Sequence, residues 1–265
     1  MTLPERGSFF SYTEILYRGD IMELISISEY RSFIPLAEKT GFGSVYPLSV
    51  AQGFQSGQIY RFGSCILFRH RSNFSFFTGT PGKEELRELH DLTVSEGLKL
   101  MCSDADICGR ICSMGGLELI PRDNYSYPRD IAPDVKLHEG FSLQKIDEKL
   151  FGSITGRVSP SLYWRDYEGF RRSGTGICVM CGSEPVSWAF TSAVSSTEAD
   201  IGIETSEPYR HRGLTAAAAA ALIGEILPGR RPTWCCQRSN LGSSRTAKKL
   251  GFVNTSECIL LRRSI

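Results

Sequence analysis

No stretch of this 265-residue sequence is apolar over the length that a membrane span needs. The first residues, MTLPERGSFFSYTE, also lack the basic start and long apolar core of a signal peptide. The net charge is only +1, so bulk electrostatics give no reason to expect binding to nucleic acid or to an anionic membrane. These absences predict a cytoplasmic protein whose partners include neither a membrane nor a nucleic acid.

A metal centre is not expected either, because the usual metal ligands do not cluster. The four histidines are scattered along the chain, and Cys178 and Cys181 have no second pair of cysteines to complete a site. Residues three apart on a strand point to opposite faces, so these two thiols cannot share an ion without a bulge. The nine cysteines are an odd number in a chain without a signal, which predicts reduced thiols.

The composition is that of an ordinary globular protein, with 41% hydrophobic and 22% charged residues. Pro121–Pro133 is rich in Arg, Asp, Asn, Tyr and Pro, which indicates an exposed approach to a domain boundary. We therefore predict an α/β protein in two parts, each with a mixed sheet. An N-terminal α/β accessory domain is expected over residues 1–137, and a second domain over residues 138–265.

Apolar periodicity predicts several local elements. Steps of three and four residues indicate helices over Tyr12–Tyr17 and Ile21–Ile34, and Glu84–Lys99 has the pattern of an amphipathic helix. A helical region is also expected over Tyr163–Arg171. The first half has no phosphate-binding signature, which indicates a supporting role for it; it is also interpreted as a degenerate relative of the second half.

The most informative stretch runs from residue 199 to residue 252. Ala199–Thr205 alternates in a period of two, as a strand does. A turn and the basic segment Arg210–Gly213 follow, and then the alanine-rich run Ala216–Ala221, which has the strongest helix propensity in the chain. Pro228 ends the predicted helix. The order is therefore strand, basic glycine-containing turn, helix.

This order predicts a phosphate or pyrophosphate site. The first turn of a helix offers unpaired N–H groups and the positive end of the helix dipole. A glycine there lets an anion approach the backbone closely, and Arg210 and Arg212 would add charged donors. The alternative is an ordinary strand–helix turn whose arginines are solvated.

Three features of this stretch resemble the GNAT superfamily of N-acetyltransferases. Arg210-x-x-Gly213-x-Thr215 is similar to its acyl-CoA pyrophosphate loop, R/Q-x-x-G-x-G/A, although Thr215 replaces the usual Gly or Ala. Asn240-x-x-Ser243, followed by a helix that ends in Leu-Gly-Phe252, resembles its second cofactor segment. The order and spacing of all these elements make the resemblance specific.

A narrower resemblance is to the zwittermicin A resistance protein group of acetyltransferases. It rests on Glu198–Thr205, on the strand with Trp234-x-Cys236, and on the set Asn240, Ser243 and Ala247. Members of that group also carry a long region before the GNAT domain. This resemblance implies acetyl transfer to a small amino-polyol antibiotic or a similar molecule.

The resemblance implies acetyl-CoA as co-substrate and assigns residues to it. Backbone groups of Ile203 and Thr205 would pair with the pantetheine arm. Asn240 and Ser243 would lie on the cofactor side, although Asn240 is also a plain helix N-cap candidate. The pyrophosphate would be held by backbone N–H groups of the loop, with Arg210 and Arg212 adding charge; the loop residues are His211, Arg212, Gly213, Leu214 and Thr215.

The resemblance also assigns one catalytic side chain. Glu204 lies on the opposite face of its strand from Ile203, where it would accept the proton of the substrate amine, and Asp200 is a second candidate on that face. The family's tyrosine, which protonates the leaving thiolate, is replaced by Ala247. Ser243 is the hydroxyl nearest in position, and the general acid stays open. Glu204 as a plain surface residue is the alternative.

The predicted function is therefore acetyl transfer from acetyl-CoA to a primary amine, with a small molecule as acceptor. Two alternatives remain at this point. One is transfer to a protein or peptide amine, and the other is a non-catalytic regulator that binds acyl-CoA. The first half of the chain is expected to shape the substrate cleft or to provide a homodimer contact.

Overall fold

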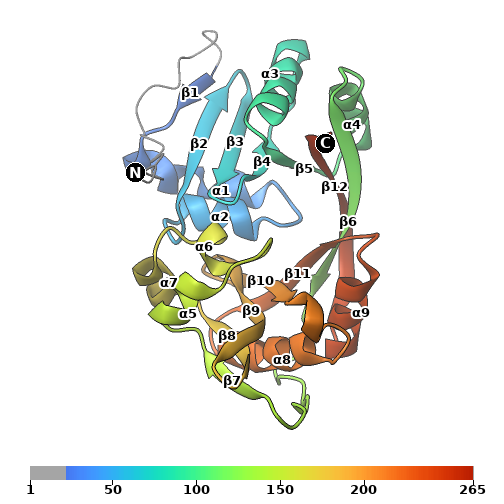
Figure 1. The fold of residues 1–265 in the computed structure, drawn as a ribbon. Coiled ribbons are helices and arrows are strands. Elements are labelled where there is room, and N and C mark those ends of the chain that lie inside the picture. Colours follow the sequence, from blue (N-terminus) through green and yellow to red (C-terminus); the bar gives the residue numbers. More distant parts are fainter. Residues whose placement is uncertain (1–21, 265) are drawn as a thin grey trace, which may run out of the picture.

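The computed structural model describes residues 22–264, and its strands form one 12-stranded sheet (Figure 1). The first half of the chain provides β1 (Met22–Leu24), the 3-10 helix η1 (Ile27–Phe33), α1 (Ile34–Glu38), α2 (Val45–Ala51), β2 (Gly57–Phe62), β3 (Cys65–His70), β4 (Phe74–Thr78), α3 (Lys83–Ser95), β5 (Lys99–Cys102), α4 (Ala105–Cys112) and β6 (Leu117–Ser126). The second half provides β7 (Ser142–Lys145), α5 (Glu148–Ser153), α6 (Pro160–Tyr163), α7 (Tyr167–Ser173), β8 (Gly176–Cys181), β9 (Glu184–Val194), β10 (Glu198–Thr205), the 3-10 helix η2 (Glu207–Tyr209), α8 (Leu214–Ile226), β11 (Arg231–Gln237), α9 (Leu241–Leu250) and β12 (Val253–Arg263). No helix in this range is long and apolar enough to cross a membrane.

Both halves of the chain follow the same strand plan. Three antiparallel strands lead through a helix to a parallel neighbour, as β2–β3–β4–α3–β5 in one half and as β8–β9–β10–α8–β11 in the other. The last strand of each half then crosses over. β6 lies between β11 and β12, and β12 lies between β5 and β6, so each half completes the sheet of the other.

The sequence predicts a separate sheet in each half. In the structure, strands from before and after residue 137 form one continuous sheet. The boundary between 137 and 138 itself stays a prediction. The interpretation of Pro121–Pro133 as an exposed approach is wrong for its first residues, which belong to β6. A proline is tolerated in this strand because β11 ends at Gln237, opposite Arg122. Beyond that end Pro121 accepts a hydrogen bond through its carbonyl from the N–H of Arg238, a contact that needs no N–H from the proline.

Two other predicted helices also differ from the structure. The segment Ile21–Ile34 folds from residue 22 as β1, η1 and the start of α1 instead of one helix. The helical region Tyr163–Arg171 is divided between α6 and α7, because Trp164 is extended and Asp166 starts α7 by accepting a hydrogen bond from the N–H of Gly169. The helix expected over Tyr12–Tyr17 lies outside the described residues.

The strand and helix predicted around the basic turn are confirmed as β10 and α8. Helix α8 packs on β8, β9 and β10, and the alanines 216–220 are buried against them. Their small side chains let the helix backbone lie close to the sheet, and alanine also has the highest helix propensity. The sequence therefore positions the start of α8 at the carboxyl end of β10.

The hydrophobic core joins the two halves. Its largest cluster contains Tyr46 of α2 and Phe76 of β4 together with Phe190 of β9 and Trp234 of β11. Helix α2 packs on β9 and β10 as well as on β3 and β4 of its own half. The first half of the chain thus forms part of the wall beside β10.

Candidate active site

The parallel strands β10 and β11 separate along their length. They pair only where Glu198–Asp200 faces Arg231–Thr233, although β10 continues to Thr205 and β11 to Gln237. Beyond Asp200, β10 keeps β9 as its neighbour, and no strand formed by residues 22–264 pairs with its other side. Such an open backbone edge can pair with an extended ligand. Ile203 and Thr205, which the family resemblance assigns to the pantetheine arm, lie on this open segment.

The loop between β10 and α8 has an unusual backbone. His211 and Gly213 both have left-handed φ angles, 64° and 73°, and His211 is one of two described non-glycine residues with a positive φ. Gly213 is the N-cap of α8 and provides no side-chain cap, so the first N–H groups of the helix keep their donor capacity. The first turn contains no acidic residue. This geometry suits an anion.

The side chains of this loop fall into two groups. Arg210, His211 and Arg212 are exposed; Arg210 lies 3.7 Å from the carboxylate of Glu207, and Arg212 stacks over the ring of Tyr209. The Leu214 side chain is buried in the core, so only its backbone is available to a ligand. These placements are compatible with the predicted phosphate site, whose occupancy stays a prediction.

Thr215, the departure from the family's loop, makes a hydroxyl contact. Its Oγ1 lies within hydrogen-bond distance of Thr205 Oγ1, and Ser187 Oγ lies 2.7 Å from Thr205 Oγ1 and 3.4 Å from Thr215 Oγ1. The cluster links β9, β10 and the first turn of α8 on one face of the sheet. We infer that it fixes the loop relative to the open edge of β10.

Glu204 lies on the opposite face of β10 from Thr205. One of its carboxylate oxygens, Oε2, accepts a 2.7 Å hydrogen bond from the N–H of Val158, in the segment between α5 and α6. The carbonyl oxygen of Val158 in turn accepts a 2.7 Å hydrogen bond from the indole N–H of Trp188. Glu204 is therefore half-buried and held in place, with its second oxygen, Oε1, free of a described partner. Its catalytic role stays a prediction.

Asp200 is a buried carboxylate on the same face as Glu204. Its Oδ2 accepts hydrogen bonds from Tyr46 (2.9 Å) and Ser192 (2.8 Å), and its Oδ1 accepts one from Thr233 (3.3 Å). Burial raises the pKa of Asp200 to about 6, against the lowering effect of these hydroxyls and of Arg122. Asp200 is also the last residue of β10 that pairs with β11, so it marks the point where the two strands separate.

Asp200 lines a cavity of about 130 Å³ that sequence reasoning did not predict. Its walls come from both halves of the chain, and the guanidinium of Arg122 in β6 also lines it. Arg122, Asn124, Tyr125 and Ser126 of β6 line the cavity, and the polar alternation of Arg122, Asn124 and Ser126 was the available signal. It is hidden in the sequence because both faces of β6 carry polar residues.

On the other face of the sheet, Asn240 and Ser243 make internal contacts. Asn240 is the N-cap of α9, and its Oδ1 accepts a 3.1 Å hydrogen bond from the N–H of Ser243. Ser243 Oγ accepts a 3.0 Å hydrogen bond from the indole of Trp234. The helix-cap interpretation of Asn240 is thus confirmed, and a cofactor contact of either residue stays a prediction. Ala247 is fully buried.

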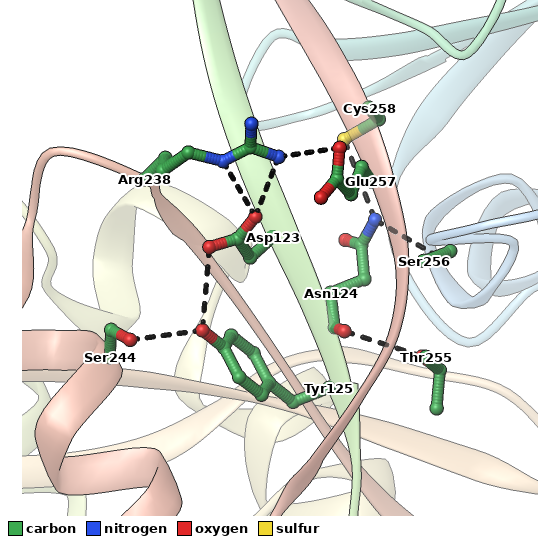
Figure 2. A network of polar contacts seen from close by, with 9 residues as sticks. All are labelled: Asp123, Asn124, Tyr125, Arg238, Ser244, Thr255, Ser256, Glu257 and Cys258. Carbon is green, nitrogen blue, oxygen red and sulfur yellow. Dashed lines mark hydrogen bonds and ion pairs between the residues drawn. The ribbon is translucent and has the colours of Figure 1, made fainter.

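A tyrosine hydroxyl from β6 contacts helix α9 (Figure 2). Tyr125 Oη lies 3.0 Å from Ser244 Oγ, and Tyr125 is buried with 2% of its surface exposed. The neighbouring Asp123 forms an ion pair with Arg238, which also pairs with Glu257 of β12 at 2.7 Å. A strand from the first half of the chain is thereby tied to helix α9 of the second half.

The corresponding turn in the first half does not suit an anion. Helix α3 also follows a parallel strand and has a glycine N-cap, Gly82, but its first turn carries Glu84 and Glu85. A Cβ atom added to Gly82 would lie 2.8 Å from a carboxylate oxygen of Glu85. Because a carboxylate lies at the start of this helix, we expect a single cofactor site per chain.

The comparisons with known proteins agree with this geometry. The sequence profile described as GNAT acetyltransferase matches residues 49–261, which include both halves of the sheet. A curated relative from Bacillus subtilis (strain 168), the uncharacterized N-acetyltransferase YdfB, is 30% identical over 145 residues, or 53% of this chain. The chain spans only 56% of that relative's length.

Solved structures share the fold at low sequence identity. A GCN5-related N-acetyltransferase-like protein from Streptococcus suis 89/1591 has a TM-score of 0.70 at 21% identity, and the similarity covers 90% of this chain and 100% of that one. A tandem GNAT protein from the clavulanic acid biosynthesis pathway has a TM-score of 0.56 at 11% identity, with coverage of 91% and 97%. With a family profile matched over most of its length, this chain belongs to the GNAT acetyltransferase family.

Proposed function

We propose that this acetyltransferase moves an acetyl group from acetyl-CoA to a primary amine of a small molecule. The observation that carries the proposal is the open edge of β10, which leads from the uncapped start of α8 to a cavity with a buried carboxylate. The pyrophosphate would bind at residues 211–215 and the pantetheine arm along Ile203 and Thr205. The zwittermicin-type resemblance suggests an amino-polyol acceptor.

The reaction needs little from the protein beyond placement and one proton acceptor. The ammonium group of the acceptor first loses a proton to a carboxylate of β10, for which Glu204 is the proposed residue. The neutral nitrogen then attacks the thioester carbonyl, whose oxygen a backbone N–H of the open segment would polarise. The C–N bond forms, the C–S bond breaks, and CoA leaves as a thiolate that takes up a proton. The products are an N-acetyl amide, CoA and one released proton.

The loop arginines provide the first test. We expect the double variant Arg210→Ala, Arg212→Ala to weaken CoA binding by tenfold or more, because both charges flank the anion site and pair only weakly with the protein. Titration calorimetry with CoA measures the change. The double variant Arg87→Ala, Arg110→Ala removes two exposed arginines near α3 and α4 and should leave affinity unchanged. Equal affinity in all three proteins would put the phosphate site elsewhere.

The Glu204→Gln variant tests the proton acceptor. Glutamine keeps an oxygen that can accept the hydrogen bond from Val158, so the loop should stay in place while the base is lost. We expect turnover to fall by roughly 100-fold, with CoA affinity nearly intact. A fully active variant would remove Glu204 from the mechanism. If, in addition, the turnover of the wild type fell as the pH was lowered below about 6, the pKa of Asp200, then Asp200 would be the proton acceptor instead.

The central test of the proposal combines binding with transfer. Acetyl-CoA and plain CoA are compared in a thermal shift titration, and thiol release is then followed with a panel of amines. If acetyl-CoA stabilises the protein and thiol is released, the result supports a transferase, and the amines that react indicate the class of acceptor. Stabilisation without release on any small amine or peptide would instead favour a regulator that binds acyl-CoA. No stabilisation by either compound would overturn the proposal.

A further inference from the structure

The cavity beside Asp200 joins the two halves of the molecule. Its lining includes Glu198 and Asp200 of β10, Arg122 and Asn124 of β6, and residues 233–235 of β11, which lies between these two strands in the sheet. Aromatic rings of the first half, such as Phe76, close it from the side of α2 and β4. Because the cavity lies where β10 and β11 separate, a molecule in it would face the end of the open edge along which the acetyl-pantetheine arm is proposed to lie.

The cation of the cavity has no carboxylate partner. Arg122 Nε donates to the thiol of Cys235 (3.1 Å), one Nη donates to the Cys235 carbonyl (3.2 Å), and the guanidinium stacks on Phe74 at 5.4 Å. No ion pair of Arg122 with Asp or Glu occurs among residues 22–264, and its remaining N–H groups have no described acceptor there. A guanidinium with unused parallel donors matches a carboxylate in geometry and charge.

The anion of the cavity also lacks an oppositely charged contact. Asp200 is only 5% exposed, and its three hydrogen-bond partners are the neutral hydroxyls of Tyr46, Ser192 and Thr233. Glu198, on the same face of β10, lines the cavity as well. A buried carboxylate is costly without a cation, so an ammonium group that enters here would be bound strongly.

We propose that this cavity binds the acceptor and that the acceptor is a small amino acid, or an equally small amine that carries a carboxylate. The carboxylate of the ligand would pair with Arg122 and its ammonium group with Asp200. In this binding mode Asp200 replaces Glu204 as the acceptor of the amine proton, because Glu204 does not line the cavity. The inference rests on the proposed acetyl transfer and narrows its substrate class. Arg122 is a binding residue that touches the acceptor. An amino-polyol without a carboxylate would be a poor ligand, so the amino acid replaces the amino-polyol that the zwittermicin-type resemblance suggests.

The size of the cavity supports a small ligand. Its volume is about 130 Å³, and a protein cavity of about 150 Å³ is known to hold benzene, a molecule of six heavy atoms. The rings of Phe74, Phe76 and Tyr46 restrict it further on the side of the first half. An amine on a folded protein surface could not bring both a carboxylate to Arg122 and an ammonium to the buried Asp200.

The test compares acids with neutral analogues of the same shape. Thiol release from acetyl-CoA is measured with the standard amino acids and, for each one accepted, with its methyl ester and its decarboxylated amine. The ester is less basic and the amine more basic than the amino acid, so basicity alone cannot explain a loss with both. We expect the wild type to use the amino acid at least tenfold better than either analogue.

Two variants connect that preference to the guanidinium. Arg122→Gln should remove the preference, and Arg122→Lys, which keeps the charge and loses the paired donors, should retain part of it. Arg238→Gln is the matched control, because Arg238 already pairs with Asp123 and Glu257, on the α9 side of the sheet. Stabilisation of each variant by acetyl-CoA shows that the fold is intact.

The outcomes separate this inference from the proposed function. If the esters and the decarboxylated amines released thiol as fast as the amino acids, the proposed carboxylate site at Arg122 would be wrong, and the proposed acetyl transfer would still hold. Calorimetric binding of an amino acid that Arg122→Gln abolishes, without thiol release, would support the site and contradict transfer. An amino-acid panel that neither binds in the presence of CoA nor releases thiol would overturn the inference directly.

Discussion

A fragment that begins at residue 138 will neither fold cooperatively nor bind acetyl-CoA, although it contains every residue proposed for the cofactor site. It lacks β6, which pairs with β11 on one side and with β12 on the other. Without β6 these two strands have no common neighbour, and the backbone groups along both edges lose their hydrogen bonds. The buried rings of Tyr125 and Tyr127 are lost from the core as well. Circular dichroism during heating and an acetyl-CoA thermal shift measure the two failures.

The control for this truncation supplies the missing strand in trans. Residues 1–137 produced in the same cell should restore a folded complex that binds acetyl-CoA, because the break falls outside the helices and strands of the structure. A cooperative melting transition of 138–265 alone, raised by acetyl-CoA, would contradict the expectation. It would mean that β11 and β12 close up on each other and that the second half is an independent domain.

The cofactor-side geometry could be predicted because its signals are local. The alternation of Ala199–Thr205 places Ile203 and Glu204 on opposite faces of one strand, and the structure has this arrangement in β10. The alanine run gives α8, and Gly213 takes the left-handed conformation that a glycine at the start of the helix permits. Each of these features depends on residues fewer than about ten positions apart in the chain, as short-range periodicity and cap preferences do.

The acceptor side could not be predicted because it depends on which strands become neighbours. Arg122 reaches the cavity only because β6 crosses to lie beside β11, and Tyr46 reaches Asp200 only because α2 packs on β9 and β10. Pro121 also argued against a central strand, since a proline has no N–H for the ladder. The local rule failed there because β11 ends opposite Arg122, and the backbone contact beyond that end uses only the carbonyl of Pro121.

The second large effect is a response to acid in which two buried groups act in opposite directions. Burial, with added repulsion from Arg71 and Lys99, lowers the pKa of His70 to about 3. Its Nδ1 is bonded to Ser72 and its Nε2 has no described partner. Burial raises the pKa of Asp200 to about 6. The unfolded chain should titrate near 6.5 for a histidine and near 3.9 for an aspartate.

The signs follow from which state binds the proton. Below pH 6.5 the unfolded chain protonates His70 and the folded protein does not, so the contribution of His70 to stability is lost as the pH falls toward 3. Asp200 holds its proton in the folded protein up to about pH 6, so its contribution is present in acid and lost as the pH rises through 6. In the wild type these two dependences partly cancel between pH 4 and 6.

Single variants should separate the two contributions. Between pH 7.5 and 4.5, His70→Asn should lose roughly 3 kcal/mol less unfolding free energy than the wild type, and Asp200→Asn roughly 2 kcal/mol more. Urea unfolding at both pH values measures the differences, and comparing slopes with pH removes any constant packing cost of the substitution. Glu88 and Glu198 also have pKa values raised by burial, but they are unchanged in every protein compared. Parallel pH profiles for the wild type and both variants would mean that neither group is buried as the fold requires. Divergence in the stated directions would instead place an ionised carboxylate without an ion-pair contact at the separation of β10 and β11 at neutral pH, which is the charge that an incoming ammonium group needs.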